Sequence, residues 1–121
     1  MPNPFVHIEL STTNHEKAKS FYGQLFNWKL QDTPMGNGVT YTMIDPAGGT
    51  GGGMVKQMEA GAPSAWLAYI DVDDIRASTA KAKALGANIK TDVTEIPGMG
   101  WFSIVTDPTG ATIGLWQTAK A

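Results

Sequence analysis

The sequence contains no cysteine among its 121 residues. This absence excludes disulfide bonds, thiolate nucleophiles and metal sites built on cysteine, so any metal site would need histidine and carboxylate ligands. Long hydrophobic runs are missing too, because nowhere do about 18 apolar residues follow one another, the length that spans a bilayer. The N-terminus also lacks a charged segment followed by an apolar stretch. We therefore expect a cytoplasmic protein without a membrane span.

An excess of positive charge is also absent. Nine basic residues face eleven acidic ones, which gives a net charge of −2, and no basic block is present. Nucleic acids and membrane surfaces are therefore not expected partners. The hydrophobic content of 42% is that of a globular chain, and the length is that of one domain.

The first half has the pattern of a strand, a helix and three further strands. Residues 5–10 alternate between apolar and polar side chains, which is typical of a half-buried strand. Asn14 is a good helix N-cap, and apolar residues then recur at helical spacing to about Asn27. Turn-forming residues divide the remainder and predict strands over 28–31, 39–44 and 52–57.

The second half repeats this order. It predicts a strand over 66–72, a helix from Asp73 or Asp74 to about Leu85, and strands over 87–91, 101–106 and 112–116. The turn Asp45-Pro46-Ala47-Gly48 returns as Asp107-Pro108-Thr109-Gly110, 62 positions later, and Gly36-x-Gly38 returns as Gly98-x-Gly100 at the same offset. Two turns kept at one offset indicate an internal duplication.

The duplication predicts a single domain of two modules, about 5–57 and 65–118, joined by a linker at about 58–64. The alternative for a mixed chain of this length is a ferredoxin-like sandwich, in which each helix is followed by fewer strands.

A family resemblance extends over nearly the whole chain. It rests on His7 within Phe5-Val6-His7-Ile8-Glu9-Leu10, on Phe21-Tyr22 fourteen residues later, on Leu25-Phe26-Asn27-Trp28, on the run from Trp66 to Asp74, and on Asp107-Pro108-x-Gly110. On these motifs the sequence resembles the vicinal oxygen chelate superfamily, which contains glyoxalase I, extradiol dioxygenases and bleomycin-resistance proteins. Within it, the sequence looks most like a branch described as glyoxalase-related.

The resemblance implies an α+β fold. Two tandem βαβββ modules would form an eight-stranded curved mixed sheet, an incomplete barrel with the helices on the outside. Each four-stranded sheet can cover its outer face with a helix, whereas its inner face must be closed by the other module or by a ligand. The resemblance therefore places the site in a cup on the inner face.

The resemblance also implies four metal-ligand positions, at His7, at or near Gly52, at Trp66 and at Gly114. Only His7 carries a suitable side chain, because glycine offers no donor atom and the indole nitrogen has no usable lone pair. We therefore expect no metal cofactor. The alternative is a divalent metal bound weakly by His7 and Glu9, with waters completing its shell.

His7 and Glu9 lie two residues apart on a predicted strand, so both should point to one face, opposite Val6, Ile8 and Leu10. They could anchor a polar ligand, act as a general base pair, or be a satisfied polar pair inside the sheet. The other histidine, His15, is expected to be exposed in the first helical turn.

Aromatic side chains are expected around the cup. Trp66 and Trp116 are predicted to point inward, with Trp101 and Tyr41 near strands that could close the cup. These rings could also simply fill space. The predicted ligand-binding residues are His7, Glu9, Tyr41, Gly52, Met54, Trp66, Trp101, Gly114 and Trp116.

Two functions are compatible with this pattern. The first is a small-molecule-binding protein with a degenerate metal site and an aromatic-lined cup, whose ligand is apolar or aromatic. The second is a glyoxalase-related lyase or isomerase in which His7 and Glu9 move a proton. Because relatives of this size commonly form homodimers, a homodimer is also expected.

Overall fold

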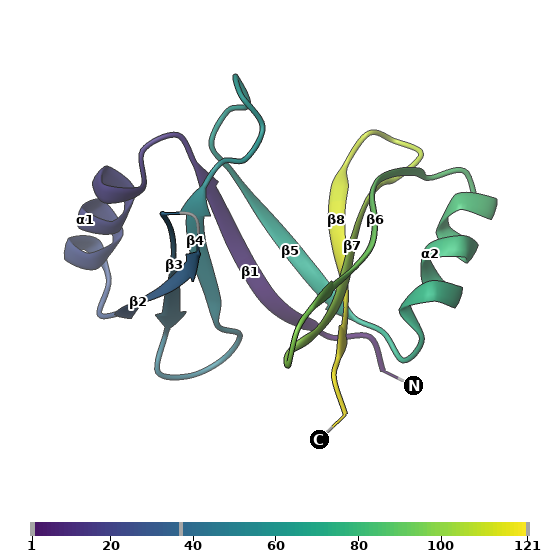
Figure 1. Ribbon diagram of the computed structural model, residues 1–121, viewed down its shortest axis with the longest axis horizontal. Helices are drawn as coiled ribbons and strands as arrows, with labels where there is room; N and C mark the ends of the chain where they lie inside the picture. Colours follow the sequence, from purple (N-terminus) through teal and green to yellow (C-terminus); the bar gives the residue numbers. More distant parts are fainter. Residues whose placement is uncertain (1, 37, 121) are drawn as a thin grey trace. The chain divides into compact units, whose positions relative to one another are not determined.

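The computed structural model describes residues 2–36 and 38–120. The predicted order of strand, helix and three strands occurs twice (Figure 1). Neither helix is long and apolar enough to cross a membrane, as judged over these residues. The elements are β1 (Phe5–Thr12), α1 (His15–Leu25), β2 (Lys29–Gly36), β3 (Val39–Asp45), β4 (Gly52–Lys56), β5 (Ala65–Asp71), α2 (Ile75–Ala84), β6 (Asn88–Ile96), β7 (Gly100–Thr106) and β8 (Thr112–Thr118).

The chain forms two compact units whose limits fall inside β1 and β5. The first unit comprises residues 7–67, and the second combines the described parts of 1–6 and 68–121. The beginning of the chain belongs to the second unit because the Asp71 amide donates to the Pro4 carbonyl and the Asn3 side chain donates to the Asp71 carbonyl.

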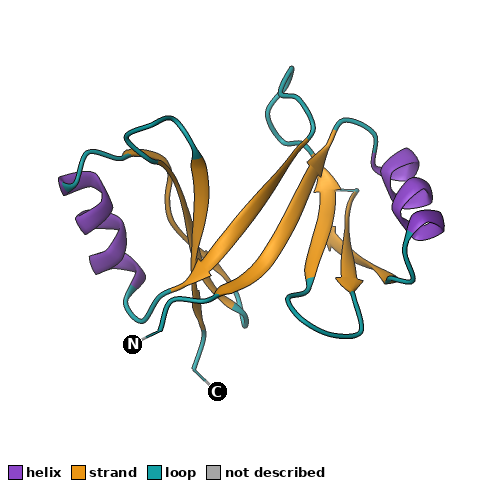
Figure 2. Ribbon diagram, turned by 180° about the vertical axis from the view of Figure 1, so that it is seen from behind, coloured by secondary structure: helices purple, strands orange, loops and turns teal. Residues whose placement is uncertain are grey.

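In the first unit the strand order is β2-β3-β4-β1. β1 and β4 are parallel, whereas β3 is antiparallel to both of its neighbours. The helix α1 begins where the Asn14 side chain accepts a hydrogen bond from the Lys17 amide. It covers one face of the sheet (Figure 2), where the buried residues Leu10, Ile44 and Met54 form the core of this unit.

In the second unit the strand order is β5-β8-β7-β6, again with one parallel pair, β5 and β8. Asp74 caps α2 through the Ala77 amide. The buried hydroxyls of Thr79 on α2 and Ser103 on β7 lie 2.9 Å apart, which identifies the face of β7 that α2 covers. The predicted α+β class, with two βαβββ repeats of mixed strand direction, is confirmed.

A polar cluster lies beneath α1. His15 Nε2 lies 2.7 Å from the hydroxyl of the fully buried Thr42, and this hydroxyl donates to Asp32. Lys19 forms an ion pair with the other carboxylate oxygen of Asp32, and hydrogen bonds from Lys19 and Thr42 lower the pKa of Asp32. The expectation that His15 is exposed was wrong, because its ring is hydrogen-bonded to Thr42 of β3 and is partly buried.

Candidate functional site

The uncovered face of the first unit's sheet carries three polar side chains. Along β1, Leu10 and Thr12 are buried towards α1, whereas His7 and Glu9 alternate with them and are partly exposed. The predicted placement of His7 and Glu9 on one face, opposite Leu10, is therefore confirmed.

Tyr41 of β3 joins this pair. Its hydroxyl lies 2.7 Å from His7 Nε2 and donates to Glu9 Oε1 at 2.8 Å. A phenol has one proton, so when it donates to Glu9 its oxygen can only accept, and the His7 Nε2–H becomes the donor. His7 Nδ1 then carries a lone pair. The trio thus joins an imidazole and a carboxylate through one phenol.

Gly53 makes this arrangement possible. β4 lies between β3 and β1, so Tyr41 must pass over β4 to reach Glu9 and His7. Gly53 is the register partner of both Glu9 and Met43, and a Cβ atom at this position would clash with the ring and the hydroxyl of Tyr41. The missing side chain is therefore what lets a residue of β3 bond to residues of β1.

The protonation of His7 follows from its surroundings. Burial lowers the pKa of the His7 imidazole, because a charged ring is poorly solvated there. The lowered pKa favours the neutral ring, which is compatible with hydrogen bonds that require a proton on Nε2. A neutral histidine beside a carboxylate can accept a proton or a hydrogen bond from a bound molecule.

The structure places Gly52 and Trp66 elsewhere than predicted. Gly52 pairs with Ile8, so it belongs to the α1 side, and a Cβ there would meet the Ile8 carbonyl. Its role is close approach of two strands. Trp66 contacts Tyr22 of α1 and Trp28 edge to face, at 5.4 and 6.4 Å between ring centroids. Neither residue lies on the face of His7.

Met54 and Trp101 also lie on the opposite side from the one predicted. Met54 is fully buried in the core beneath α1, because it pairs with Leu10. Trp101 has the strand parity of Ser103, so it belongs to the face that α2 covers. Both were predicted as ligand-binding residues, with Trp101 near strands that could close the cup, whereas strand parity assigns both residues to the helix-covered sides.

The uncovered face of the second unit's sheet is aromatic. Gly114 and Trp116 lie on it, opposite Leu115 and Ser103 and therefore away from α2. Phe102 is the register partner of Trp116, and a Cβ at Gly114 would clash with the ring of Tyr69. Tyr69 and Phe102 were not predicted as site residues. The alternation along β5 and β7 was the signal that could have identified them.

The register explains these errors. Glu9 pairs with Gly53 in the first unit and Tyr69 pairs with Gly114 in the second, so the two pairs are equivalent. The first strands of the two units are therefore offset by 60 residues (Glu9 to Tyr69), and the strands paired with them by 61 (Gly53 to Gly114). The turns, in contrast, are offset by 62 residues. A shift by one residue moves a side chain to the other face.

The donor atoms present do not fit the four-ligand metal site that the resemblance implies. No group of three or more His, Cys, Asp or Glu side chains occurs within residues 2–36 and 38–120. On this face of the first unit, His7 and Glu9 already bond to Tyr41, and Gly53 adds no donor.

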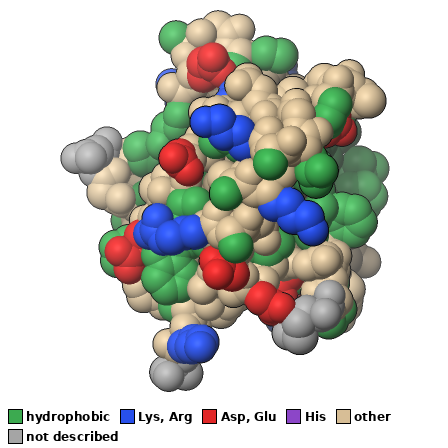
Figure 3. All heavy atoms as spheres, turned by 90° about the vertical axis from the view of Figure 1, so that its right-hand side faces the viewer, with side chains coloured by type: hydrophobic (Ala, Val, Ile, Leu, Met, Phe, Trp, Pro, Cys, Tyr) green, Lys and Arg blue, Asp and Glu red, His purple; other side chains and the backbone are tan. Residues whose placement is uncertain are grey.

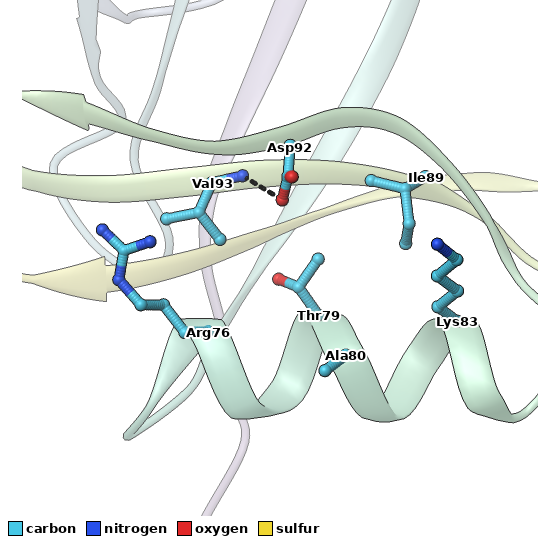
Figure 4. Close-up of a pocket in the computed structure, with 7 residues that line it drawn as sticks. All are labelled: Arg76, Thr79, Ala80, Lys83, Ile89, Asp92 and Val93. Carbon is cyan, nitrogen blue, oxygen red and sulfur yellow. Dashed lines mark hydrogen bonds between the residues drawn. The ribbon is translucent and has the colours of Figure 1, made fainter.

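Two open grooves lie on the helix-covered sides of the units and not on the uncovered sheet faces. One, of about 300 Å³, runs between α2 and β6, where Arg76 and Lys83 flank the apolar side chains of Ala80, Ile89 and Val93 (Figure 4). The other, of about 350 Å³, lies between α1 and Leu30 of β2. Both are wide surface depressions on the helix side of each unit.

Comparison with known proteins agrees with this architecture. A family model described as the glyoxalase/bleomycin resistance protein/dioxygenase superfamily matches residues 5–115. The putative glyoxylases CFP32 of Mycobacterium bovis and Mycobacterium tuberculosis are 37% identical over 118 residues, which is 93% of this chain and 45% of theirs. The chain thus spans less than half the length of these relatives.

Solved structures show the same fold at low identity. A hypothetical protein, BH1468 from Bacillus halodurans, has a TM-score of 0.74 at 15% identity, covering all of this chain and 98% of that one. Methylmalonyl-CoA epimerase from Mycobacterium tuberculosis has a TM-score of 0.71 at 12% identity, covering 96% and 88%. By its fold and by the match of the family model over residues 5–115, this chain belongs to the glyoxalase/bleomycin resistance protein/dioxygenase superfamily.

Proposed function

We propose that this chain binds a small molecule on the uncovered sheet face of its first unit without a metal ion. The observation that supports the proposal is the hydrogen-bonded trio of His7, Tyr41 and Glu9. The trio holds an imidazole and a carboxylate in a fixed geometry on one sheet face, and both are groups that bind hydrogen-bond donors.

The trio favours ligands that donate hydrogen bonds. His7 Nδ1 and the Glu9 carboxylate are acceptors, so a hydroxyl or an N–H group on the ligand suits them. The second unit carries the half-buried rings of Phe102 and Trp116 on the sheet face that α2 leaves uncovered. That surface suits a flat apolar or aromatic molecule.

Catechol is a suitable probe because two adjacent hydroxyls sit on a flat ring. Its affinity would be measured by isothermal titration calorimetry with EDTA present. We expect Tyr41→Phe to weaken binding about ten-fold, since one mispositioned hydrogen-bonding group costs about that much. Tyr22→Phe removes a phenol oxygen from the α1 side and is the matched control. Absence of binding to the wild-type protein, or equal affinity of both variants, would contradict the proposal.

Metal independence has a separate test. Protein purified without chelators should contain much less than one equivalent of any divalent metal by mass spectrometry. A full equivalent that disappears in His7→Ala would show that the chain is a metalloprotein and would overturn this part of the proposal.

A second candidate function is proton transfer, as in a lyase or an isomerase. It is favoured by the neutral state of His7, whose pKa is lowered by burial, and by the second acceptor on the same phenol. Catalysis would then require His7 Nδ1 to take a proton from a bound substrate. Exchange of a carbon-bound deuterium on a bound ligand, lost in His7→Gln, would distinguish an enzyme from a binding protein.

A further inference from the structure

The groove between α2 and β6 carries two positive groups that the protein does not neutralise by contact. Arg76 and Lys83 line this groove, and within residues 2–36 and 38–120 neither side chain forms an ion pair. Figure 3 views the molecule from the side that carries α2, where basic side chains lie among apolar ones. The groove therefore offers positive charge to an anion from outside the chain.

The two cations stand at opposite ends of the groove. They are seven residues apart on α2, so about 10 Å separates their backbone positions along the helix axis. Figure 4 shows both side chains extending from the helix towards β6, Arg76 on the side of Val93 and Lys83 on the side of Ile89. Between them, the half-buried Ile89 and Val93 lie across from Ala80 of α2. The groove thus has an apolar middle and two basic ends.

Asp92 restricts where a bound anion can carry its charge. Its carboxylate lies between the two ends of the groove and accepts a hydrogen bond from the Val93 amide at 2.7 Å (Figure 4). A negative charge in the middle of the groove would be repelled by this carboxylate, whereas charges at the ends would meet Arg76 and Lys83. The groove therefore favours an anion whose charges are separated by a neutral body.

The equivalent groove of the first unit lacks these features. The caps of α1 and α2 are 60 positions apart, so the two cations correspond to Glu16 and Gly23, which both line the groove beside α1. The lysine of that groove, Lys19, is paired with Asp32. Because the same place in the fold has no unpaired cation in the first unit, the fold itself does not require the two basic ends.

We propose that the groove between α2 and β6 binds a small molecule with an apolar body and a carboxylate at each end. Guanidinium and ammonium groups both bind carboxylates, and the apolar middle suits a hydrocarbon chain. The volume of about 300 Å³ is that of a small-molecule site. The groove belongs to the second unit and shares no residue with the trio, so it can bind this ligand whether or not the trio binds another.

Sebacate, a straight-chain dicarboxylate, is the probe for this groove. Nuclear magnetic resonance titration of isotope-labelled protein reports both affinity and place, and the methyl groups of Ile89 and Val93 should shift. We expect a dissociation constant on the order of 1 mM at low ionic strength, as for a small ligand in an open site, and weaker binding as salt is added. No shift, or shifts confined to the uncovered sheet faces, would overturn the proposal.

Charge variants test whether the two cations hold the probe. Arg76→Gln and Lys83→Gln should each raise the dissociation constant about three-fold, and the double variant about ten-fold, because one exposed ion pair contributes modestly. Lys81→Gln removes the same charge from α2 at a position outside the groove and is the matched control. Equal weakening by Lys81→Gln, or no weakening by either groove variant, would contradict the proposal.

Decanoate, the monocarboxylate of the same chain length, tests whether both ends matter. It should bind about three-fold more weakly than sebacate, because it can engage only one cation. Equal affinity for the two probes would contradict the requirement for two carboxylates. A glutamate-rich peptide that binds where sebacate does not would assign the groove to a protein partner and would overturn the proposal. Catechol affinity should be the same in Arg76→Gln as in the wild type, so failure here is distinguishable from failure of the proposed function.

Discussion

The two units share one backbone plan and differ on the sheet face that their helices leave uncovered. Each has a glycine beside its first strand, Gly53 or Gly114, over which a tyrosine ring lies. In the first unit the ring belongs to Tyr41, which reaches over β4 to two polar residues of β1. In the second unit it belongs to Tyr69 of β5 itself. A tyrosine ring over a glycine is common to both halves, whereas the neighbours differ: His7 and Glu9 make the first face polar, and Phe102 and Trp116 make the second aromatic.

The assignment of Met54 to the core gives the largest expected effect. Met54→Ala should lower the free energy of unfolding by about 2–5 kcal/mol, because it leaves a cavity beneath α1. Met43, on the adjacent strand and 40% exposed, is the matched control. Met43→Ala should change stability by no more than about 0.5 kcal/mol. Urea unfolding measures both, and equal losses would mean that the faces of the first unit are wrongly assigned.

Gly53→Ala should have the next largest effect. The added methyl group meets the Tyr41 ring, so we expect a loss of about 1–3 kcal/mol, typical of overpacking. Gly48→Ala, at a turn position with no atoms near the new methyl group, is the control. The loss should nearly vanish in a Tyr41→Ser background, because the ring that causes it is gone. If it persists there, Tyr41 does not cross β4 at Gly53.

Tyr41→Phe converts the first unit towards the second, whose equivalent residue is Phe102. Loss of the hydroxyl should cost about 1 kcal/mol, because His7 and Glu9 lose a shared partner. Tyr22→Phe should cost less, since its ring and not its oxygen makes the contacts of the α1 side. Thermal unfolding of the two variants measures the difference, and an equal cost would remove the reason for treating the trio as special.

The smallest expected effect is a pH dependence that belongs to His7. Because its pKa is lowered in the folded state, the unfolded chain binds more protons between that lowered value and about pH 6.5. The contribution of neutral His7 to stability is therefore present above this window and is lost as the pH falls through it. Comparing wild type with His7→Gln in urea at several pH values isolates the effect. A stability advantage of wild type over His7→Gln that shrinks as the pH rises through this window would have the wrong sign.

The architecture could be predicted from the sequence because its signals are local. Helix caps at Asn14 and Asp74, the repeated Asp-Pro turns and the alternation of β1 are each readable over a few residues. Boundaries moved by small amounts, as for α1, which ends at Leu25 and not at Asn27. The placement of His7 and Glu9 on one face followed from that same alternation.

The rest of the site depends on register, which is not local. The family resemblance placed Gly52 and Trp66 in the site as the counterparts of Gly114 and His7, whereas the registers make Gly53 the counterpart of Gly114 and offset the first strands by 60 residues. Such a change exchanges the faces of a strand. The contact of Tyr41 with Glu9 joins residues 32 positions apart across an intervening strand, so only the strand order reveals it.

The most direct test of the hydrogen-bonded trio of His7, Tyr41 and Glu9 is the protonation state of the His7 ring. A long-range proton–nitrogen correlation spectrum at neutral pH, with His15→Gln to assign the second histidine, distinguishes the two ring nitrogens. The hydrogen bonds of the trio predict that Nε2 of His7 is protonated and donates to Tyr41, and that Nδ1 of the same ring is unprotonated. A proton on Nδ1 with none on Nε2 would contradict the direction of the hydrogen bonds, and a proton on both nitrogens would contradict the neutral ring on which the proposed binding role depends.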